Sequence, residues 1–317
     1  MEVYSNYKNN RTILFIGNIS LDIIKNRQGI SRTIIGGGAY ISAYCAKMVS
    51  NNLKIKILSI LGNDFPLDII NFLRDKKIDV SEIQIVSKNS NSFIIEEGNN
   101  KIEEGNNKSK IKIKNLLELG NFPIREKIDH LHVSCRKGVK SPYFYLTTSK
   151  YEKSSMDVIF SSLKEKCKEI KKCLELIDMV FLNSLEYKML NKYIKPKIES
   201  FFPEVIFVIT QGEKGVSIKK GKKVFYFPGI KIDKKKNVSN TGAGDAFLGS
   251  FLGSYYSSNS PIEALMTAVS AATLSLQDFG ITHLGNKLSI LKNYQNKLLS
   301  KYKKMEDELS EIFFTQK

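Results

Sequence analysis

The sequence predicts an α/β fold, with a central, mostly parallel sheet, helices on both faces of that sheet, and a small β lid. Apolar runs of strand length alternate with segments of helical spacing, and glycine-containing turns join several of them. One polar, repetitive stretch interrupts this alternation. At 317 residues the chain is long enough for a sizeable core, and no linker clearly divides it, so we expect a single domain over residues 1–317.

The amino-terminal part of the chain shows the alternation first. Residues 11–20 (RTILFIGNIS) are an apolar run that ends at Gly-Asn, which predicts a buried parallel strand that meets a loop. A glycine turn then opens a predicted helix over 34–50. The next strand is predicted over 53–64 and the next helix over 66–79. This order of elements favours a parallel sheet.

The stretch 88–115 has a different character, because the heptad IEEGNNK occurs at 95–101 and again at 102–108. Its Gly-Asn-Asn triplets suit hairpin turns, and the isoleucine and glutamate flanks suit short strands. Two interpretations stay open: a mobile lid over a site, or a duplication in a surface loop. In the first, residues of about 23–35 would complete the lid.

The remaining elements follow the same patterns. They are strands over 129–135 and 156–160, an amphipathic helix over 164–178, a strand running into a helix over 179–190, a strand, turn and hairpin over 204–228, a helix over 261–280, and a final packing helix over about 287–313.

Composition excludes several classes of protein. The cysteines and histidines are few and scattered, without a CxxC pair: Cys45, Cys135, Cys167, Cys173, His130, His132 and His283. A structural zinc site is therefore not expected, and reduced thiols are. Residues 1–11 are polar with no apolar segment after them, and no stretch approaches the roughly 18 apolar residues of a membrane helix. We expect a cytoplasmic protein with no membrane partner.

The net charge of +17 raises the question of a nucleic-acid partner. The lysines are spread along the whole chain, which favours a solvated basic surface over a dedicated nucleic-acid interface. Such a surface would also attract an anionic substrate such as a nucleotide.

Two glycines, an alanine and an aspartate stand at the head of an apolar, small-residue helix predicted within 237–255. Gly242 and Gly244 can adopt backbone angles closed to other residues, and their N–H groups, with that of Ala243, would point outward from a helix start. A helix amino terminus carries free donors and a partial positive charge, so this turn can hold a phosphate. Asp245 beside it makes more sense as a base, which takes a proton from an attacking hydroxyl, than as a surface acid.

The segment TGAGDAF at 241–247 resembles the second signature of the PfkB, or ribokinase-like, carbohydrate kinase family, and the resemblance covers nearly the whole chain. In that family the GAGD turn binds the transferring phosphate, and its aspartate is the catalytic base. The resemblance implies these roles for Gly242, Ala243, Gly244 and Asp245.

Further segments match the family in its own order. FLNSLE at 181–186 resembles the N-x-x-E that helps to place magnesium and the nucleotide phosphates, which implies that role for Asn183 and Glu186. The same two residues also fit a helix cap and its capping box. TQGEKG at 210–215 resembles the T-x-G-x-x-G that lies along the ATP phosphates. This implies a cofactor-binding role for Thr210, Gly212 and Gly215.

The acceptor side of the site is implied by two amino-terminal segments. GNISLD at 17–22 resembles the loop whose aspartate binds sugar hydroxyls, and Asp22 is the matching residue. An ionised carboxylate accepts from two hydroxyls at once, which suits a polyol. GGGAYISAYCA at 36–46 resembles the di-glycine turn against which the substrate lies, which implies Gly37 and Gly38. LGND at 61–64 resembles a further loop of the family.

The sequence also departs from the family at two places. Many sugar-phosphorylating members carry an asparagine shortly after the di-glycine, whereas Tyr40 or Ile41 stands there in this chain. A flatter or more apolar acceptor, such as a nucleoside, then becomes an alternative. Members activated by a monovalent cation carry an aspartate three residues before the signature glycine, and Ser239 takes its place here.

The resemblance as a whole implies a kinase that transfers the γ-phosphoryl group of ATP to a hydroxymethyl group of a sugar or sugar-like molecule, with ATP and Mg²⁺ as cofactors. Two alternatives stay open: a nucleoside kinase of the same fold, and a non-catalytic protein that binds a sugar, a nucleotide or nucleic acid. A homodimer formed through the lid is compatible with either enzyme.

Overall fold

The computed structural model describes residues 11–26, 28–97, 110–233 and 237–287, together with residues 291, 293, 302 and 305–314. The second IEEGNNK copy and the Gly-Asn-Asn triplets therefore lie outside the described residues. Most of the final helix predicted over about 287–313 lies outside them too.

Within the described residues, a nine-stranded central sheet has the order β13-β12-β11-β10-β9-β8-β1-β4-β5. Neighbouring strands are parallel from β11 to β5, and only the hairpin β12–β13 adds antiparallel pairs at the other end. The strands are β1 (Thr12–Ile16), β4 (Lys54–Gly62), β5 (Ile78–Val86), β8 (Lys127–Cys135), β9 (Lys150–Val158), β10 (Met179–Asn183), β11 (Ile206–Thr210), β12 (Gly215–Lys220) and β13 (Lys223–Pro228).

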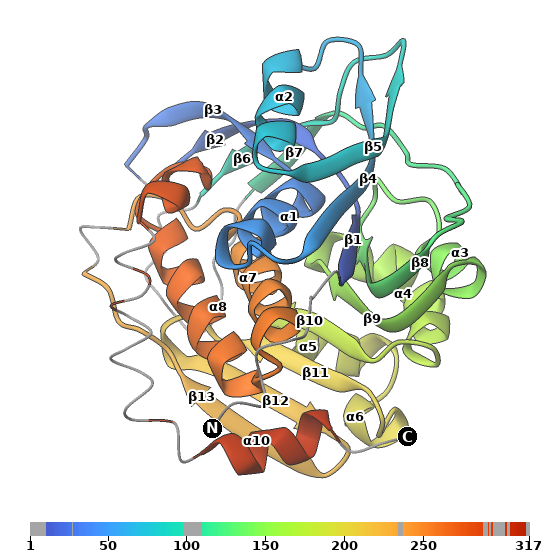
Figure 1. The fold of residues 1–317 in the computed structure, drawn as a ribbon, viewed down its shortest axis with the longest axis vertical. Helices are drawn as coiled ribbons and strands as arrows, with labels where there is room; N and C mark the ends of the chain where they lie inside the picture. Colours follow the sequence, from blue (N-terminus) through green and yellow to red (C-terminus); the bar gives the residue numbers. More distant parts are fainter. Residues whose placement is uncertain are drawn as a thin grey trace.

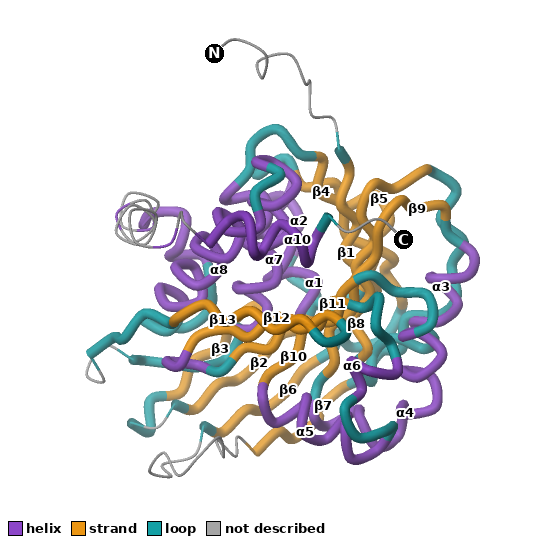
Figure 2. The backbone as a smooth tube through the Cα atoms, turned by 90° about the horizontal axis from the view of Figure 1, so that it is seen from below, coloured by secondary structure: helices purple, strands orange, loops and turns teal. Residues whose placement is uncertain are grey.

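Helices cover both faces of this sheet (Figures 1 and 2). One face packs against α1 (Gly38–Val49), α2 (Leu67–Asp75), α7 (Ala243–Ser258), α8 (Pro261–Ser275) and α10 (Glu306–Phe313). The other packs against α3 (Pro142–Thr148), α4 (Phe160–Leu174), α5 (Ser184–Tyr193) and α6 (Ile198–Phe201). Side chains alternate between the faces along each strand, so β1 sends Phe15 into the first core and Leu14 into the second. The predicted α/β fold, with helices on both faces of a mostly parallel sheet, is confirmed.

A second, small sheet has the order β3-β2-β6-β7 in the described part of the chain. It consists of β2 (Ser20–Lys25), β3 (Ser31–Gly36), β6 (Ser92–Glu96) and β7 (Lys110–Asn115), and lies in the upper part of Figure 1. Both predicted lid segments supply strands to it, and β6 pairs antiparallel with β7.

Several elements differ from their predicted bounds: the strand predicted over 156–160 spans Lys150–Val158, and the helix predicted over 164–178 spans Phe160–Leu174. The helix predicted over 66–79 ends at Asp75, because Lys77 takes a left-handed conformation at φ 57° and turns the chain. The strand β5 then follows at the edge of the sheet, where half of its side chains face solvent, so its sequence lacks a continuous apolar run. The short helix α3 was also not predicted.

The described residues contain no helix long and apolar enough to cross a membrane. All four cysteines fall in described segments and are free, and Cys45, Cys135 and Cys173 are buried.

Candidate active site

Polar side chains collect where the parallel strands end. In the central sheet β1 lies between β4 and β8. The chain first adds β4 and β5 on one side of β1 and then adds β8 to β13 on the other side, so the order of the strands reverses at β1. Open α/β sheets bind ligands outside the carboxyl ends of their strands at such a switch point. Asn18 follows β1, Arg136 follows β8, Asp157 lies near the end of β9, and Asn183 and Thr210 end β10 and β11. These residues define the candidate site.

The start of α7 faces this edge. Gly242 is its N-cap and has φ 85°, a left-handed conformation that suits glycine. A Cβ added there would lie 2.9 Å from the Cδ1 atom of Ile41 on α1, which is the end of a flexible side chain, so it is the backbone angle that favours glycine. No described side chain caps α7, and Asp245 lies in its first turn. The helix start therefore offers backbone N–H groups to an anion.

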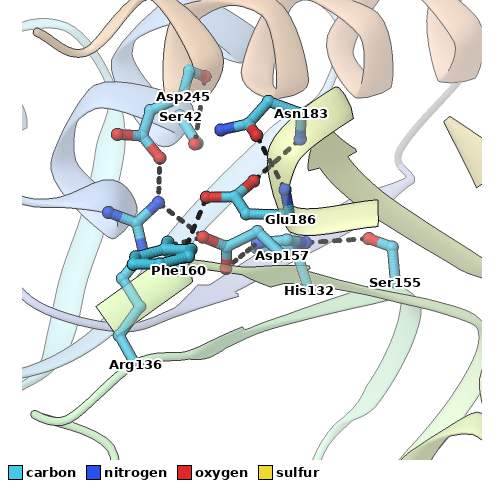
Figure 3. Close-up of polar contacts among 9 residues, drawn as sticks. All are labelled: Ser42, His132, Arg136, Ser155, Asp157, Phe160, Asn183, Glu186 and Asp245. Carbon is cyan, nitrogen blue, oxygen red and sulfur yellow. Dashed lines mark hydrogen bonds and ion pairs between the residues drawn. The ribbon is translucent and has the colours of Figure 1, made fainter. Parts of the chain in front are cut away.

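Asp245 is held by an arginine that the sequence analysis did not identify. The guanidinium of Arg136 lies between two carboxylates (Figure 3). Its Nη2 donates to Oδ1 of Asp245, and its Nε donates to Oδ2 of Asp157 at 2.7 Å. Burial opposes the charge of Arg136, but the two carboxylates outweigh it and raise its pKa. Burial raises the pKa of Asp245, although Arg136 opposes that rise.

A buried series of polar contacts runs from Asp157 through His132 and Ser155 to His130 and Tyr256. The Nε2 atom of His132 lies 3.4 Å from Oδ1 of Asp157, and its Nδ1 lies 2.9 Å from the hydroxyl of Ser155. The same hydroxyl lies 2.7 Å from Nε2 of His130, whose Nδ1 lies 2.8 Å from the hydroxyl of Tyr256. Burial lowers the pKa of His130 well below its ordinary value. This series of contacts fixes Asp157, and Asp157 in turn fixes Arg136.

Asn183 and Glu186 form the capping box that their spacing suggested. The Asn183 side chain accepts from the backbone N–H of Glu186 at 2.9 Å, and Oε2 of Glu186 accepts from the Asn183 N–H at 2.7 Å. Its Oε1 accepts from the N–H of Phe160 at 3.2 Å. Burial raises the pKa of Glu186 to about 7. The described residues hold no group of three or more acids, histidines or cysteines suited to a metal ion.

The T-x-G-x-x-G segment lies beside the capping box. Thr210 pairs with Asn183 in the register of β10 and β11. Gly212 and Gly215 have φ angles of 59° and 111° and form the tight turn into β12. A Cβ on Gly215 would lie 2.1 Å from the carbonyl oxygen of Phe227, so no larger residue fits there. The turn thus has the close backbone geometry expected of it.

The acceptor residues predicted from the sequence also meet at this edge. Asp22 is 4% exposed, and its Oδ1 accepts no hydrogen bond from the described residues. Burial raises the pKa of Asp22 to about 6, although the charge of Arg136 opposes this. A Cβ on Gly36 would lie 2.0 Å from Oδ2 of Asp22, and one on Gly38 would lie 2.9 Å from Cζ of Arg136. Gly37, with φ 97°, caps α1 between them.

The structure therefore brings the predicted residues of the acceptor, phosphate and N-x-x-E segments to one edge of the sheet. Sequence analysis missed Arg136 and Asp157. A signal for both was present, because one is a charge directly after a buried strand and the other a charge inside one.

Comparisons with known proteins agree on an enzyme class, the phosphotransferases that use an alcohol group as acceptor. Residues 12–287 match the family described as pfkB family carbohydrate kinase, and the chain belongs to that family. A cytidine kinase of Thermococcus kodakarensis is 26% identical over 265 residues, which cover 79% of this chain and 90% of the relative. Adenosine kinase 1 of Arabidopsis thaliana is 30% identical over 128 residues, which cover 35% of this chain and 37% of that protein.

Solved structures show the same fold. The nucleoside kinase of Methanocaldococcus jannaschii, an archaeal member of the ribokinase family, superposes with a TM-score of 0.71 at 19% identity, over 90% of this chain and 98% of its own. The fructokinase of Vibrio cholerae, solved with fructose, ADP and a calcium ion, has a TM-score of 0.72 at 18% identity, over 90% and 99%. The predicted ribokinase-like fold is confirmed.

Proposed function

We propose that this protein is an ATP-dependent kinase that phosphorylates a hydroxymethyl group of a nucleoside or sugar. The observation that carries the proposal is the position of Asp245. It lies in the first turn of a helix that no described side chain caps, paired with Arg136, at the edge of the sheet where Asp22 is buried. Phosphoryl transfer to a hydroxyl requires a base, a site for the anionic phosphates and a residue that binds the hydroxyls of the acceptor. Asp245, the start of α7 and Asp22 fit these three roles.

In this proposal Asp245 takes the proton from the acceptor hydroxyl as that oxygen attacks the γ-phosphorus. The bond from the γ-phosphorus to the β–γ bridging oxygen breaks, and ADP leaves with that oxygen. The N–H groups of Gly242, Ala243 and Gly244 stabilise the charge on the transferring group. Arg136 lies beside Asp245 and contributes a cationic partner for that charge. Its pairing with Asp157 orients the guanidinium plane before substrate arrives.

Asp22, Gly37 and Gly38 would bind the acceptor. The free oxygen of Asp22 suits two neighbouring hydroxyls, as in a ribose or a related sugar. We favour a nucleoside acceptor, because the curated relatives are a cytidine kinase and an adenosine kinase. The buried Tyr40 and Ile41, in place of the asparagine of many sugar kinases, agree with this choice.

Thr210, Gly212 and Gly215 would lie along the ATP phosphates, with Asn183 at the neighbouring strand end. Both oxygens of Glu186 already accept backbone N–H groups, so we assign it to Mg²⁺ through bound water rather than by direct contact. The ion would neutralise phosphate charge, and these residues would hold it in register with the start of α7.

We also propose that residues 1–317 form a single kinase domain with the small sheet as its lid, and that the lid pairs two copies of the chain. The edge strand β7 exposes Ile111 and Ile113, which share one face of the sheet. A second small sheet is the partner that an exposed apolar strand of this kind fits.

A coupled ADP-release assay tests the function, with Mg·ATP and a panel of cytidine, adenosine, inosine, ribose and fructose. Asp245→Asn should lower turnover by about two to four orders of magnitude, the range of general bases, and leave Mg·ATP binding intact. Near-normal turnover in this variant would remove the base assignment. Silence across the panel without nucleotide binding would favour the non-catalytic alternative.

A further inference from the structure

Glu97, the residue directly after β6, reaches the turn that leads into α7. Its side chain is buried, with 8% of the residue exposed. Its Oε1 accepts from the backbone N–H of Asn240 at 2.8 Å and of Thr241 at 3.0 Å. The hydroxyls of Ser239 and Thr241 donate to the same oxygen at 2.7 and 2.8 Å. The small sheet thus supplies an anion to the segment that precedes Gly242.

Other contacts hold the same turn. Asn26, at the end of β2, donates from Nδ2 to the carbonyl oxygen of Val238 at 3.0 Å. On the far side, the carbonyl oxygen of Leu276 after α8 accepts from the N–H of Val238 at 2.7 Å. Hydrogen bonds to a carboxylate are stronger than those between neutral groups, so Glu97 contributes most to the order of this turn.

Glu97 also connects the turn to the acceptor side of the site. Asp22 lies on β2, which pairs with β6 along Ile23–Ile94 and Lys25–Glu96. The N–H of Glu97 then donates to the carbonyl oxygen of Lys25 at 2.9 Å. Hydrogen bonds therefore connect the Asp22 strand, through the backbone N–H and the side-chain carboxylate of Glu97, to the turn that leads into α7.

We propose that Glu97 is a positioning residue: it holds the turn at 239–241, and through it the amides of Gly242 to Gly244, in the arrangement that binds phosphate. The sheet that carries the acceptor residue thereby also sets the phosphate site. This inference rests on the proposed kinase function. It also assigns a role to the first IEEGNNK copy, of which Glu97 is the third residue.

The test is the affinity of the full chain for Mg·AMP-PNP, measured by calorimetry, beside amide hydrogen exchange across residues 237–242. Glu97→Gln keeps the shape of the side chain but removes its charge. It should weaken nucleotide binding about tenfold and speed exchange at the amides of Asn240 and Thr241, with an unchanged melting temperature. Ser239→Ala removes one of the four described donors to Glu97, together with the acceptor of a 3.2 Å contact from the Thr241 N–H, and should shift the affinity by less than about threefold.

Glu96→Gln is the matched control, because Glu96 is the neighbouring glutamate but is exposed. It should leave both readouts at their wild-type values. If Glu97→Gln speeds amide hydrogen exchange at the turn but binds Mg·AMP-PNP with wild-type affinity, the positioning role alone is overturned. If amide hydrogen exchange at the turn is unchanged, the contact between Glu97 and the turn is itself overturned. A wild-type chain that does not bind Mg·AMP-PNP would overturn the proposed function, and the positioning role with it.

Discussion

Arg136 contacts two carboxylates at once, Asp157 through Nε and Asp245 through Nη2. Breaking a buried ion pair leaves an uncompensated charge, so each member of this group constrains the other two. The histidine and serine side chains behind Asp157 are buried and share hydrogen bonds, and burial keeps the pKa of His130 well below its ordinary value. At the scale of single residues, the candidate base is thus oriented before any substrate binds.

The raised pKa values of Asp22 and Glu186 predict how activity depends on pH. The ionised carboxylate of Asp22 accepts hydrogen bonds from the hydroxyl groups of the phosphate acceptor. Protonation of the carboxylate removes this capacity. Because its pKa is about 6, kcat/KM for the acceptor should fall about tenfold per pH unit below that value. Glu186 has a pKa of about 7, so kcat/KM for Mg·ATP should begin to fall near pH 7. Steady-state rates between pH 4.5 and 8.5 measure both acid limbs, the fall of kcat/KM for the acceptor and the fall of kcat/KM for Mg·ATP as the pH decreases.

Asp22→Asn supplies the control for this prediction. It should lower kcat/KM for the acceptor at all pH values and abolish the limb near 6, while the Mg·ATP limb stays. Acid limbs near pH 4 in both wild-type profiles would contradict the burial of these two carboxylates.

At the scale of elements, the position of α7 depends on its close packing against α1. A Cβ added to Gly249 would lie 2.1 Å from the carbonyl oxygen of Ser42, and one on Gly253 would lie 2.6 Å from that of Ala46. The Ser42 hydroxyl also donates to the carbonyl oxygen of Asp245 at 3.1 Å. The small-residue face of this helix therefore places the start of α7 against the di-glycine turn.

Gly249→Ala should lower the free energy of unfolding by about 1–3 kcal/mol, because the new methyl group meets helix backbone that cannot yield. Urea unfolding monitored by circular dichroism gives this value. Gly244→Ala is the control for stability, since a Cβ there meets no atom within 4 Å. Equal stability of the two variants would contradict the tight approach of α1 and α7.

At the scale of the whole molecule, the proposed pairing of two small sheets predicts a dimer. Ile111→Lys combined with Ile113→Lys should convert it to a monomer, because two lysines would then face their symmetry mates in the interface. Sedimentation velocity measures the change. Ile85→Lys, on the edge strand of the central sheet and 58% exposed, should remain dimeric. A monomeric wild-type chain would refute the pairing.

Several parts of this molecule depend on short segments, and the sequence alone determined them. The glycine turn proposed to bind an anion and Asp245 are contiguous in 242–245, and the capping box spans only 183–186. Local backbone chemistry is enough to form such features, so they can be predicted from the sequence without a structure. The alternation of strands and helices can be predicted for the same reason, because the apolar periodicity of each segment indicates its own secondary structure.

Tertiary structure decided the rest. Arg136 meets Asp245 across 109 positions of sequence, and Glu97 meets Thr241 across 144. No spacing in the chain encodes such contacts, because they arise only when the carboxyl ends of parallel strands and the end of the small sheet converge on one helix start. The sequence therefore determined which chemical groups the protein carries. The fold decided which of them meet, since burial brings distant charges within reach of one another and makes their pairing obligatory.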